Sequence, residues 1–431
     1  MAKRFQAPKG TRDLLPPETA VWARVEETAR RIFGLYGYGE IRTPLFEDTE
    51  LFARGVGEAT DIVGKEMYSF EDKGGRGLTL RPESTAAVCR AYVEHGMQSR
   101  PQPVRLFYIG PQFRYERPQK GRFRQFHQIG AELLGGKGPE SDAEIIWMLW
   151  RFLNSLGFRD LKIHLNTVGD RASRAAYSEA LRQYLLPLKE KLSEDSRRRL
   201  ETNPLRILDS KSPEEQELLR GAPALEQSLT AASATHFRRV LSYLEAFGLS
   251  FKVPKIFEVS PNLVRGLDYY TNTVFEIVSE GLGAQNAICG GGAYEGLVEE
   301  LGGPPTYGVG FAIGEDRLIE VLPPDSPARR GSPGPVLVTR AGKSTDEEGT
   351  GAGVLALLEE LREVGIPCQE ASARGGKLFD LAESLGSPAA VFLGEEELAA
   401  ATLSVRTLAT REQRTLPRSA AVAALKSLYP T

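Results

Sequence analysis

The chain has 431 residues, of which 41% are hydrophobic and 26% charged, so it can bury several cores and needs neither disulfides nor metals to fold. Its 54 Lys and Arg residues against 57 Asp and Glu give a net charge of −3, which excludes an overall basic field and leaves only a local patch for nucleic acid. No apolar run reaches the roughly 18 residues of a membrane span, and no apolar segment of a secretory signal follows the basic start. We therefore expect neither a membrane-spanning nor a secreted protein.

The few cysteines and histidines argue against two kinds of site. Cys89, Cys289 and Cys368 are far apart and odd in number, which is typical of a reducing cytoplasm and not of a disulfide framework. No HExxH, CxxC or paired His/Cys spacing is present, so we expect no bound metal. No GxxxxGK[ST] phosphate loop is present either, and a nucleotide would have to bind by another route.

The first 170 residues alternate between helical and strand patterns. Apolar residues recur at helical spacing around short strand-like runs, with glycines and prolines between them. Two longer strand patterns flank a polar loop at residues 116–122, as in an antiparallel hairpin. Ser141 and Glu144 have the spacing of a helix-capping box. The predicted helices are 16–36, 84–95 and 141–156, and the predicted strands are 40–46, 78–81, 105–115, 123–133 and 161–168.

The sequence pattern changes in the middle of the chain. From residue 170 to about 249, charged residues and Leu/Ala recur at helical spacing, which predicts a helical insertion between sheet segments. Strand patterns return at 263–277, 286–289 and 306–311, and a helix begins near Gly314. Residues 323–335, rich in Pro, Ser and Gly, predict a linker.

Strands and helices alternate after this linker, which predicts a small α/β domain of about 95 residues. The predicted strands are 336–339, 366–370, 389–393, 403–408 and 413–416, and the predicted helices are 350–364, 376–385 and 420–428.

A basic cluster marks the predicted hairpin. Between residues 100 and 124, seven Lys and Arg residues stand against one acid, Glu116, in a chain that is net negative. Arg114 lies near the end of the predicted strand and Glu116 directly after it, two residues apart, so a strand pattern that continues to Glu116 would put both on one face. Rigidly held guanidinium groups bind phosphate oxygens in a fork geometry, which favours a phosphate site, although a solvated hairpin tip is the alternative.

Two further segments carry charged residues in unusual places. LTLRPEST, residues 78–85, puts Glu83 and Thr85 at a strand-to-helix transition, where the carboxylate could cap the helix or hold a ligand ammonium group. LVRGLDYY, residues 263–270, puts Arg265 and Asp268 in an apolar stretch. A charge there is costly unless it is paired or functional, so a structural Arg–Asp ion pair and a ligand site both stay open.

Two glycine-rich segments follow. CGGGAYEGL at residues 289–297 contains three consecutive glycines, which allow the backbone to approach a ligand closely. GVGFAIGEDRL at residues 308–318 runs from a predicted strand into a helix that carries Arg317. The glycine run, the strand and the helix-borne cation therefore form one candidate unit.

Together these segments resemble the histidyl-tRNA synthetase family of class II aminoacyl-tRNA synthetases. IRTP at 41–44, FYIGPQFRYERPQKGRFRQFHQIGAE at 107–132 and GVGFAIGEDRL at 308–318 are similar to the three motifs of the class. LVRGLDYY is similar to a signature particular to the histidine-specific family. The match begins at KGTRDLLP, residues 9–16, and covers nearly the whole chain.

The resemblance implies an α+β fold. A class II catalytic domain on an antiparallel sheet, with a helical insertion, would precede a C-terminal α/β anticodon-binding domain, and this sheet binds ATP without a Walker loop. The expected boundaries are 1–169 and 251–322 for the catalytic domain, 170–250 for the insertion, 323–335 for the linker and 336–431 for the anticodon-binding domain.

The resemblance also implies the activity of a histidine–tRNA ligase. Such an enzyme activates L-histidine with ATP and Mg²⁺ to histidyl-adenylate and pyrophosphate, and then transfers histidine to the 3′ end of its tRNA. We further expect a cytoplasmic homodimer with no membrane contact.

The same resemblance implies roles for individual residues. Arg265 would bridge the histidine carboxylate and the α-phosphate, and Arg114 would contact the α-phosphate, so we expect these two to be catalytic. Glu116 would lie at the adenine and Arg317 along the γ-phosphate. The other expected contacts are Glu83, Thr85 and Gln128 with the α-amino group, Glu132, Tyr270 and Tyr294 with the imidazole, and Arg117, Lys120 and Arg122 with the tRNA acceptor end.

Two alternatives remain open from the sequence. A non-catalytic paralogue serves as regulatory subunit of ATP phosphoribosyltransferase, and Ala293, where the family usually has Arg, favours it. Glu295 likewise replaces the usual Asp, which puts the packing or a ligand contact of that segment in doubt. A synthetase for proline or threonine is the second alternative, and it leaves LVRGLDYY unexplained. The joint presence of the expected arginines, Glu83 and a C-terminal domain favours the ligase.

Overall fold

The computed structural model describes residues 4–57, 60, 62–118, 121–210, 212–251, 257–279, 287–331, 333–341, 347–373 and 375–429. Contacts divide the chain into two units, Met1–Ala328 and Arg329–Thr431, which we call unit 1 and unit 2. Within the described part of the chain, no helix is both long enough and apolar enough to cross a membrane.

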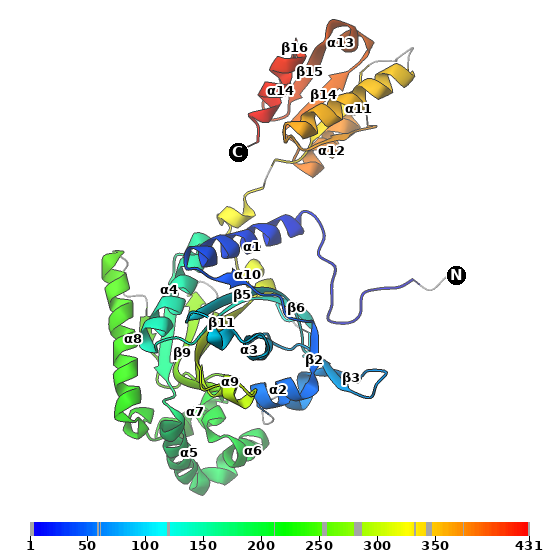
Figure 1. The fold of residues 1–431 in the computed structure, drawn as a ribbon. Helices are drawn as coiled ribbons and strands as arrows, with labels where there is room; N and C mark the ends of the chain where they lie inside the picture. Colours follow the sequence, from blue (N-terminus) through cyan, green and yellow to red (C-terminus); the bar gives the residue numbers. More distant parts are fainter. Residues whose placement is uncertain are drawn as a thin grey trace. The chain divides into compact units, whose positions relative to one another are not determined.

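A mostly antiparallel sheet of eight strands organises unit 1 (Figure 1). Its order is β1-β5-β6-β11-β10-β9-β7-β8, and only the outer pairs β1–β5 and β7–β8 are parallel. The strands are β1 Gly39–Glu40, β5 Val104–Phe113, β6 Gln125–Leu134, β7 Leu161–Thr167, β8 Phe257–Val259, β9 Tyr270–Ser279, β10 Ala287–Glu295 and β11 Tyr307–Gly314. A second sheet, β2-β4-β3, consists of β2 Phe46–Asp48, β3 Tyr68–Glu71 and β4 Gly77–Leu80. The α+β prediction is confirmed.

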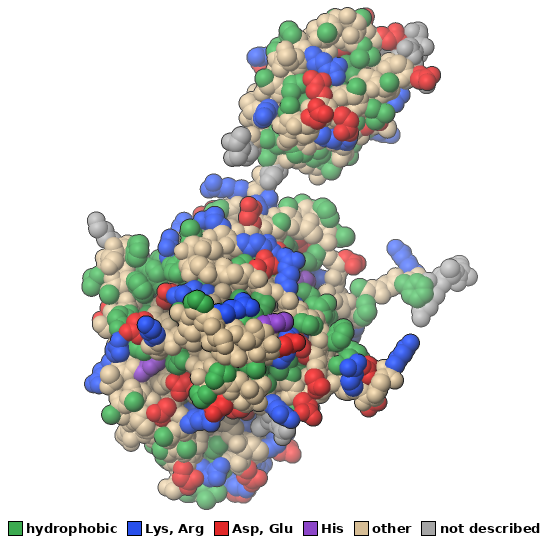
Figure 2. All heavy atoms as spheres, viewed as in Figure 1, with side chains coloured by type: hydrophobic (Ala, Val, Ile, Leu, Met, Phe, Trp, Pro, Cys, Tyr) green, Lys and Arg blue, Asp and Glu red, His purple; other side chains and the backbone are tan. Residues whose placement is uncertain are grey.

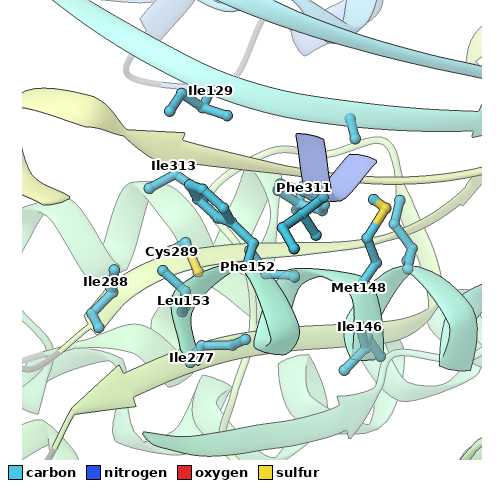
Figure 3. Close-up of a cluster of buried hydrophobic side chains, with 14 of the residues drawn as sticks. Ile129, Ile146, Met148, Phe152, Leu153, Ile277, Ile288, Cys289, Phe311 and Ile313 are labelled. Carbon is cyan, nitrogen blue, oxygen red and sulfur yellow. The ribbon is translucent and has the colours of Figure 1, made fainter. Parts of the chain in front are cut away.

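Alternation along the central strands gives the large sheet two different faces. On β6, Ile129, Ala131 and Leu133 point into a core with helices α1 (Glu18–Leu35) and α4 (Pro139–Ser155). Phe152 and Leu153 of α4 meet Phe311 and Ile313 of β11 and Ile277 of β9 in this core (Figure 3). The intervening residues of β6 and β11 face the other way, where polar side chains lie.

Short helices cover part of this second face. Helix α3 (Thr85–Glu94) packs Val88 and Tyr92 against Tyr108 of β5 and Tyr294 of β10. The neighbouring helices on this face are α2 Thr49–Val56 and α9 Leu297–Glu300, whereas Leu318 and Ile319 of α10 Glu315–Glu320 pack into the core with α1. Figure 2 shows Lys and Arg side chains interspersed with Asp and Glu over the visible face of unit 1, in line with the near balance of charge in the whole chain.

The segment between β7 and β8 is helical where the structure describes it. It contains α5 Arg171–Leu185, α6 Glu194–Thr202, the 3₁₀ turn η4 Pro204–Asp209, α7 Pro213–Leu219 and α8 Ala231–Ser250. A buried polar cluster ties α8 to the sheet, because His236 lies 2.8 Å from a carboxylate oxygen of Asp142 and Tyr307 donates to the other oxygen at 2.5 Å.

Several local predictions were wrong. The strand predicted at 40–46 is two strands in two sheets, and residues 263–269 precede β9 instead of belonging to it. Helix α4 begins two residues before Ser141, whose hydroxyl accepts from Lys137 N at 3.2 Å, so the predicted capping box does not form. Tertiary contacts decide such boundaries, and local sequence patterns do not record them. Asn286, in the strand predicted at 286–289, lies outside the described residues.

Unit 2 is an α/β fold around a five-stranded sheet of order β13-β12-β14-β15-β16. Alternate residues of β12 face opposite cores, with Val338 toward α11 and Leu337 toward α12. The elements are β12 Val336–Arg340, α11 Glu347–Glu363, β13 Cys368–Glu370, α12 Gly376–Leu385, β14 Ala389–Leu393, α13 Glu395–Ala400, β15 Thr402–Thr407, β16 Gln413–Pro417 and α14 Arg418–Lys426.

Glu315→Gln is expected to stabilise unit 1 in a pH-dependent way. Glu315 is fully buried, and both of its oxygens lack a hydrogen-bond partner among the described residues. Burial, with Glu26 and Asp316 nearby, raises its pKa to about 9. A carboxyl group whose pKa is raised in the folded state lowers the free energy of unfolding as the pH rises from its pKa in the unfolded chain toward 9. The variant should therefore match the parent near pH 5 and gain about 2 kcal/mol or more at pH 8.

The measurement is the melting temperature of unit 1 between pH 5 and pH 9. Glu27→Gln, an exposed change on α1, is the control and should show no such pH trend. A difference between Glu315→Gln and the parent that stays constant across this range would contradict the prediction.

Candidate active site

A cavity of about 420 Å³ opens on the polar face of the large sheet, next to the N-terminus of α3. It brings together residues that lie more than 200 positions apart in the sequence. The predicted site residues that line it are Glu83, Thr85, Arg114, Glu116, Arg122, Gln128, Glu132, Arg265, Tyr270 and Tyr294.

Two buried carboxyl groups stand at one side of this cavity. Glu83 accepts from the backbone N–H groups of Thr85 at 2.7 Å and Ala86 at 2.9 Å, so it caps α3 and also lines the cavity. Glu132 accepts from Thr85 Oγ1 at 2.7 Å and from Tyr294 OH at 2.8 Å. Thr85 thus joins the two carboxyl groups, and both are held in place by neutral donors.

Burial dominates the electrostatics of this pair. It raises the pKa of Glu132 to about 8, because loss of hydration outweighs the hydrogen bonds from Thr85 and Tyr294. It also raises the pKa of Glu83, against the backbone donors and the charge of Arg114. A cationic ligand group would compensate these carboxylates, which is what an ammonium group or an imidazole ring offers.

Glycines make room for these side chains on the sheet. A Cβ on Gly310 of β11 would clash with the carboxylate of Glu132, and one on Gly290 of β10 would lie 2.6 Å from the guanidinium carbon of Arg265. Larger residues at either position would push these charged groups away from the sheet. These glycines therefore allow the site's own side chains to approach the sheet closely, whereas the sequence had suggested the close approach of a ligand.

Arg265 also lines the cavity and forms an ion pair with Glu276 of β9. The Arg265–Asp268 pair considered from the sequence is thus not the pair formed: Asp268 instead accepts from Asn203 Nδ2 at 2.6 Å. Burial opposes the charge of Arg265, but Tyr270 and Glu276 outweigh it and raise the guanidinium pKa. Its side chain stays one quarter exposed, so a charged ligand can reach it.

A charged cluster lies where the β5–β6 hairpin meets its loop, and it consists of Arg114, Glu116 and Arg122. Glu116 lies 3.3 Å from Arg122 and 4.0 Å from Arg114. The prediction that Arg114 and Glu116 share a strand face was wrong, because β5 ends at Phe113. Arg114 is instead held by its Nε donating to Pro82 O at 2.9 Å and by the ring of Phe126, 5.3 Å away.

Three predicted site residues are not among those that line the cavity. Arg317 lies on α10, 3.7 Å from Glu320, and would be 3.3 Å from a Cβ placed on Gly121 in the hairpin loop. Arg117 is described but does not line the cavity. Lys120 lies outside the described residues.

The cavity also contains residues that sequence reasoning missed. Arg206 reaches it from η4 and Glu66 from the turn at Ile62–Glu66. Neither lies in a recognisable motif, so no signal marked them. Tyr269 lines the cavity beside Tyr270, and its place in the signature could have indicated it. Among the described residues, no group of three or more His, Cys, Asp or Glu side chains is arranged to hold a metal ion.

The two departures from the family pattern lie away from the cavity lining. Ala293 is fully buried in the core with α1 and α4, on the face opposite to that of Tyr294. Glu295 accepts from Asn272 Nδ2 at 3.1 Å. The missing arginine at position 293 therefore removes no side chain from this cavity.

Comparisons with known proteins show the family to which this chain belongs. A family model described as histidyl-tRNA synthetase matches residues 10–318, and one described as an anticodon binding domain matches residues 344–428. Similar curated proteins include histidine–tRNA ligases of Thermosynechococcus vestitus, 47% identical over 96% of this chain and 94% of the relative, and of Moorella thermoacetica, 48% identical over 96% of each. The crystal structure of apo histidyl-tRNA synthetase from S. aureus is 35% identical, with a TM-score of 0.79 over 98% of this chain and 100% of that one.

Proposed function

This chain belongs to the histidyl-tRNA synthetase family and is an ATP-dependent histidine–tRNA ligase, and on this premise we propose that its 420 Å³ cavity is where histidine is joined to AMP. The observation that carries the proposal is the presence of both kinds of charge in one cavity. Two buried carboxyl groups, Glu83 and Glu132, and two cations, Arg114 and Arg265, line it together. Histidine and ATP present the complementary charges.

Histidine would bind among these charged groups. Its α-ammonium group would meet Glu83, Thr85 and Gln128, and the buried Oε1 of Gln128, which has no hydrogen-bond partner among the described residues, is an acceptor suited to it. The imidazole would meet Glu132 and Tyr270, with Tyr294 behind Glu132. A pocket that hydrogen-bonds both ring nitrogens leaves polar groups unpaired with a wrong amino acid, which can give about 10⁴–10⁵ discrimination.

ATP would place its α-phosphate between Arg114 and Arg265. Glu116 would accept from the adenine side, and Arg317 would lie along the γ-phosphate. Mg²⁺ enters with ATP as part of this substrate. Gly290 supports the pose, since it lets the Arg265 guanidinium lie against the sheet.

Positioning and charge stabilisation account for the first reaction. A histidine carboxylate oxygen attacks the α-phosphorus, a C–O–P linkage forms, and the bond to the β-phosphate breaks to release pyrophosphate. Arg265 would touch both anionic partners, so it brings them together and neutralises charge as it develops. In the second reaction a terminal ribose hydroxyl of the tRNA attacks the acyl carbon, and AMP leaves.

The tRNA and the assembly complete the proposal. Arg117, Lys120 and Arg122 would contact the acceptor end, because the hairpin loop that carries them borders the cavity at Arg122. Residues 336–431 would read the anticodon, after a linker at 323–335. Residues 1–169 and 251–322 would form the catalytic domain, interrupted by an insertion at 170–250. We also propose that the enzyme is a cytoplasmic homodimer that carries no bound metal of its own.

Histidine-dependent ATP–pyrophosphate exchange with the purified chain tests this function. Exchange with histidine, and none with proline or threonine, is expected. Absence of exchange would favour the regulatory paralogue. Ala293 suggested this alternative. Its side chain lies in the core and does not line the cavity, so it is weak support for the regulatory paralogue.

Removal of the residues after Pro335 is expected to separate the two reactions. Unit 2 has its own core and sheet, and unit 1 alone contains the described cavity. The shortened chain should keep most of its ATP–pyrophosphate exchange and charge tRNA at least about tenfold more slowly, because anticodon contacts are lost. Aminoacylation with labelled histidine measures this. Equal charging by the full and shortened chains would contradict an anticodon-reading role for unit 2.

A further inference from the structure

We propose that Arg174 is a positioning residue for histidine: from the helical insertion it holds the Arg265–Tyr270 segment at the geometry that the ligand needs. This inference rests on the proposed function of the cavity. Five of the six residues of the segment line the cavity, and Asp268 is the one that does not. Two residues of the insertion bind Asp268: Arg174 donates to its backbone carbonyl and Asn203 to its carboxylate.

Arg174 binds the backbone of the segment directly. From helix α5, its Nη1 donates to the carbonyl oxygens of Asp268 and Tyr270, each at 2.8 Å. The first carbonyl directly precedes Tyr269 and the second belongs to Tyr270, the first residue of β9, so one side chain fixes the backbone on both sides of the tyrosine pair. Burial lowers the pKa of Arg174, although Asp268 opposes this. Partial burial of this cation costs free energy of folding. The two hydrogen bonds that it makes fix the backbone of the segment.

The side chain of Asp268 adds a second anchor. It accepts from Asn203 Nδ2 at 2.6 Å, just after α6. On the other side it lies against Gly57 at the end of α2, where a Cβ would be 2.8 Å from Asp268 Oδ2. Gly57 has a φ of +102°, so a larger residue is disfavoured there by its backbone as well. The segment is therefore held between the insertion and α2.

The anchored backbone determines where the tyrosine rings lie. The ring of Tyr270 lies against Gly292, whose Cβ would be 2.8 Å from it, and the ring of Tyr269 meets Tyr294 edge-on with centroids 5.6 Å apart. Tyr294 in turn donates to Glu132. Loss of Arg174 would free the carbonyls behind both rings, and the group proposed to bind the imidazole would shift. Histidine binding should suffer more than ATP binding.

The experiment compares Arg174→Met and Arg174→Lys with the parent by histidine-dependent ATP–pyrophosphate exchange. A shift of about 1 Å in a positioned group can cost up to 10²-fold. We expect Arg174→Met to raise the KM for histidine about tenfold or more, with less than about threefold change in the KM for ATP. Arg174→Lys should recover part of the loss, because an ammonium group can still donate to one carbonyl. Arg182→Met, on the exposed side of the same helix, is the control and should leave both KM values unchanged.

Asn203→Ala is the second variant if Arg174→Met does not fold. It should raise the KM for histidine by about threefold, since one anchor remains. If the parent is active and the folded variants keep its KM for histidine, this inference is overturned and the proposed function stands. The same holds if the KM for ATP rises as much as the KM for histidine. A parent without histidine-dependent exchange overturns the proposed function, and this inference with it.

Discussion

Arg265→Ala is expected to lower histidine-dependent ATP–pyrophosphate exchange by about 10³–10⁵-fold while the chain stays folded. Arg265 is the one residue proposed to contact both reacting anions, the histidine carboxylate and the α-phosphate. Without it, two negative groups must approach each other in a cavity that already holds Glu83 and Glu132. The loss should appear in kcat as well as in KM, because a cation between the two anions stabilises the charge of the transition state.

The ion pair with Glu276 complicates this experiment, and a double variant resolves it. Arg265→Ala leaves a carboxylate without its partner, so a fall in stability alone could lower the activity. Arg265→Met combined with Glu276→Gln removes both charges; it should restore the melting temperature and leave exchange as low as in the single variant. Arg105→Ala is the matched control, since Arg105 of β5 pairs with Glu144 of α4 at 3.2 Å and does not line the cavity. Exchange within about tenfold of the parent in the double variant would contradict the assigned role.

The long central strands of the large sheet could be predicted because their signals are local, whereas the short strand β8 was not predicted. The two-residue period of the hairpin strands places Gln128 and Glu132 on one face and apolar residues on the other, and the structure has this arrangement. Most elements of unit 2 also agree: β14 and α12 have the predicted bounds. Both depend on periodicity within one element, which the sequence records directly.

The charged partners could not be predicted, because pairing across elements depends on strand register and tertiary packing. Arg265 pairs with Glu276, eleven residues later on β9, and not with the nearer Asp268. Arg206 enters the cavity from a segment with no motif. Glu315 is buried without a hydrogen-bond partner among the described residues, and its acidic neighbours in sequence give no sign of that. The family resemblance predicted which residues would contact the ligands in the cavity. It did not predict which residues hold those side chains in position.

Glu132→Gln is expected to lower kcat/KM for histidine about 10²-fold, the effect of losing one hydrogen bond to a charged group. In the free protein, burial raises the pKa of Glu132 to about 8, and the ring of free histidine has a pKa of about 6.5. Glu83 would already balance the α-ammonium group, so a lone negative charge at Glu132 would be uncompensated. We therefore expect the bound pair to hold one shared proton, with Glu132 and the imidazole together neutral.

A shared proton fixes the sign of the pH dependence. Below about pH 6.5 the two groups carry one proton too many, and above about pH 8 one too few, so kcat/KM for histidine should be level between these values and fall on both sides. Tyr108, Tyr294 and Cys89 around Glu132 have pKa values raised well above their usual ranges by burial, so they do not titrate in this window. Burial also raises the pKa of Glu83, so the pH profile of the parent alone does not assign the fall above pH 8 to Glu132. The Glu132→Gln variant makes this assignment.

In Glu132→Gln the fall above pH 8 should disappear, because the amide keeps its protons at every pH in the range. Exchange rates at low histidine concentration between pH 5.5 and 9 measure this, with Glu27→Gln on the exposed side of α1 as the control that keeps the parent profile. A parent profile that keeps rising through pH 8 would mean that the imidazole binds to an ionised Glu132 without a shared proton. An unchanged fall in the variant would assign the proton to another group, of which Glu83 is the nearest candidate.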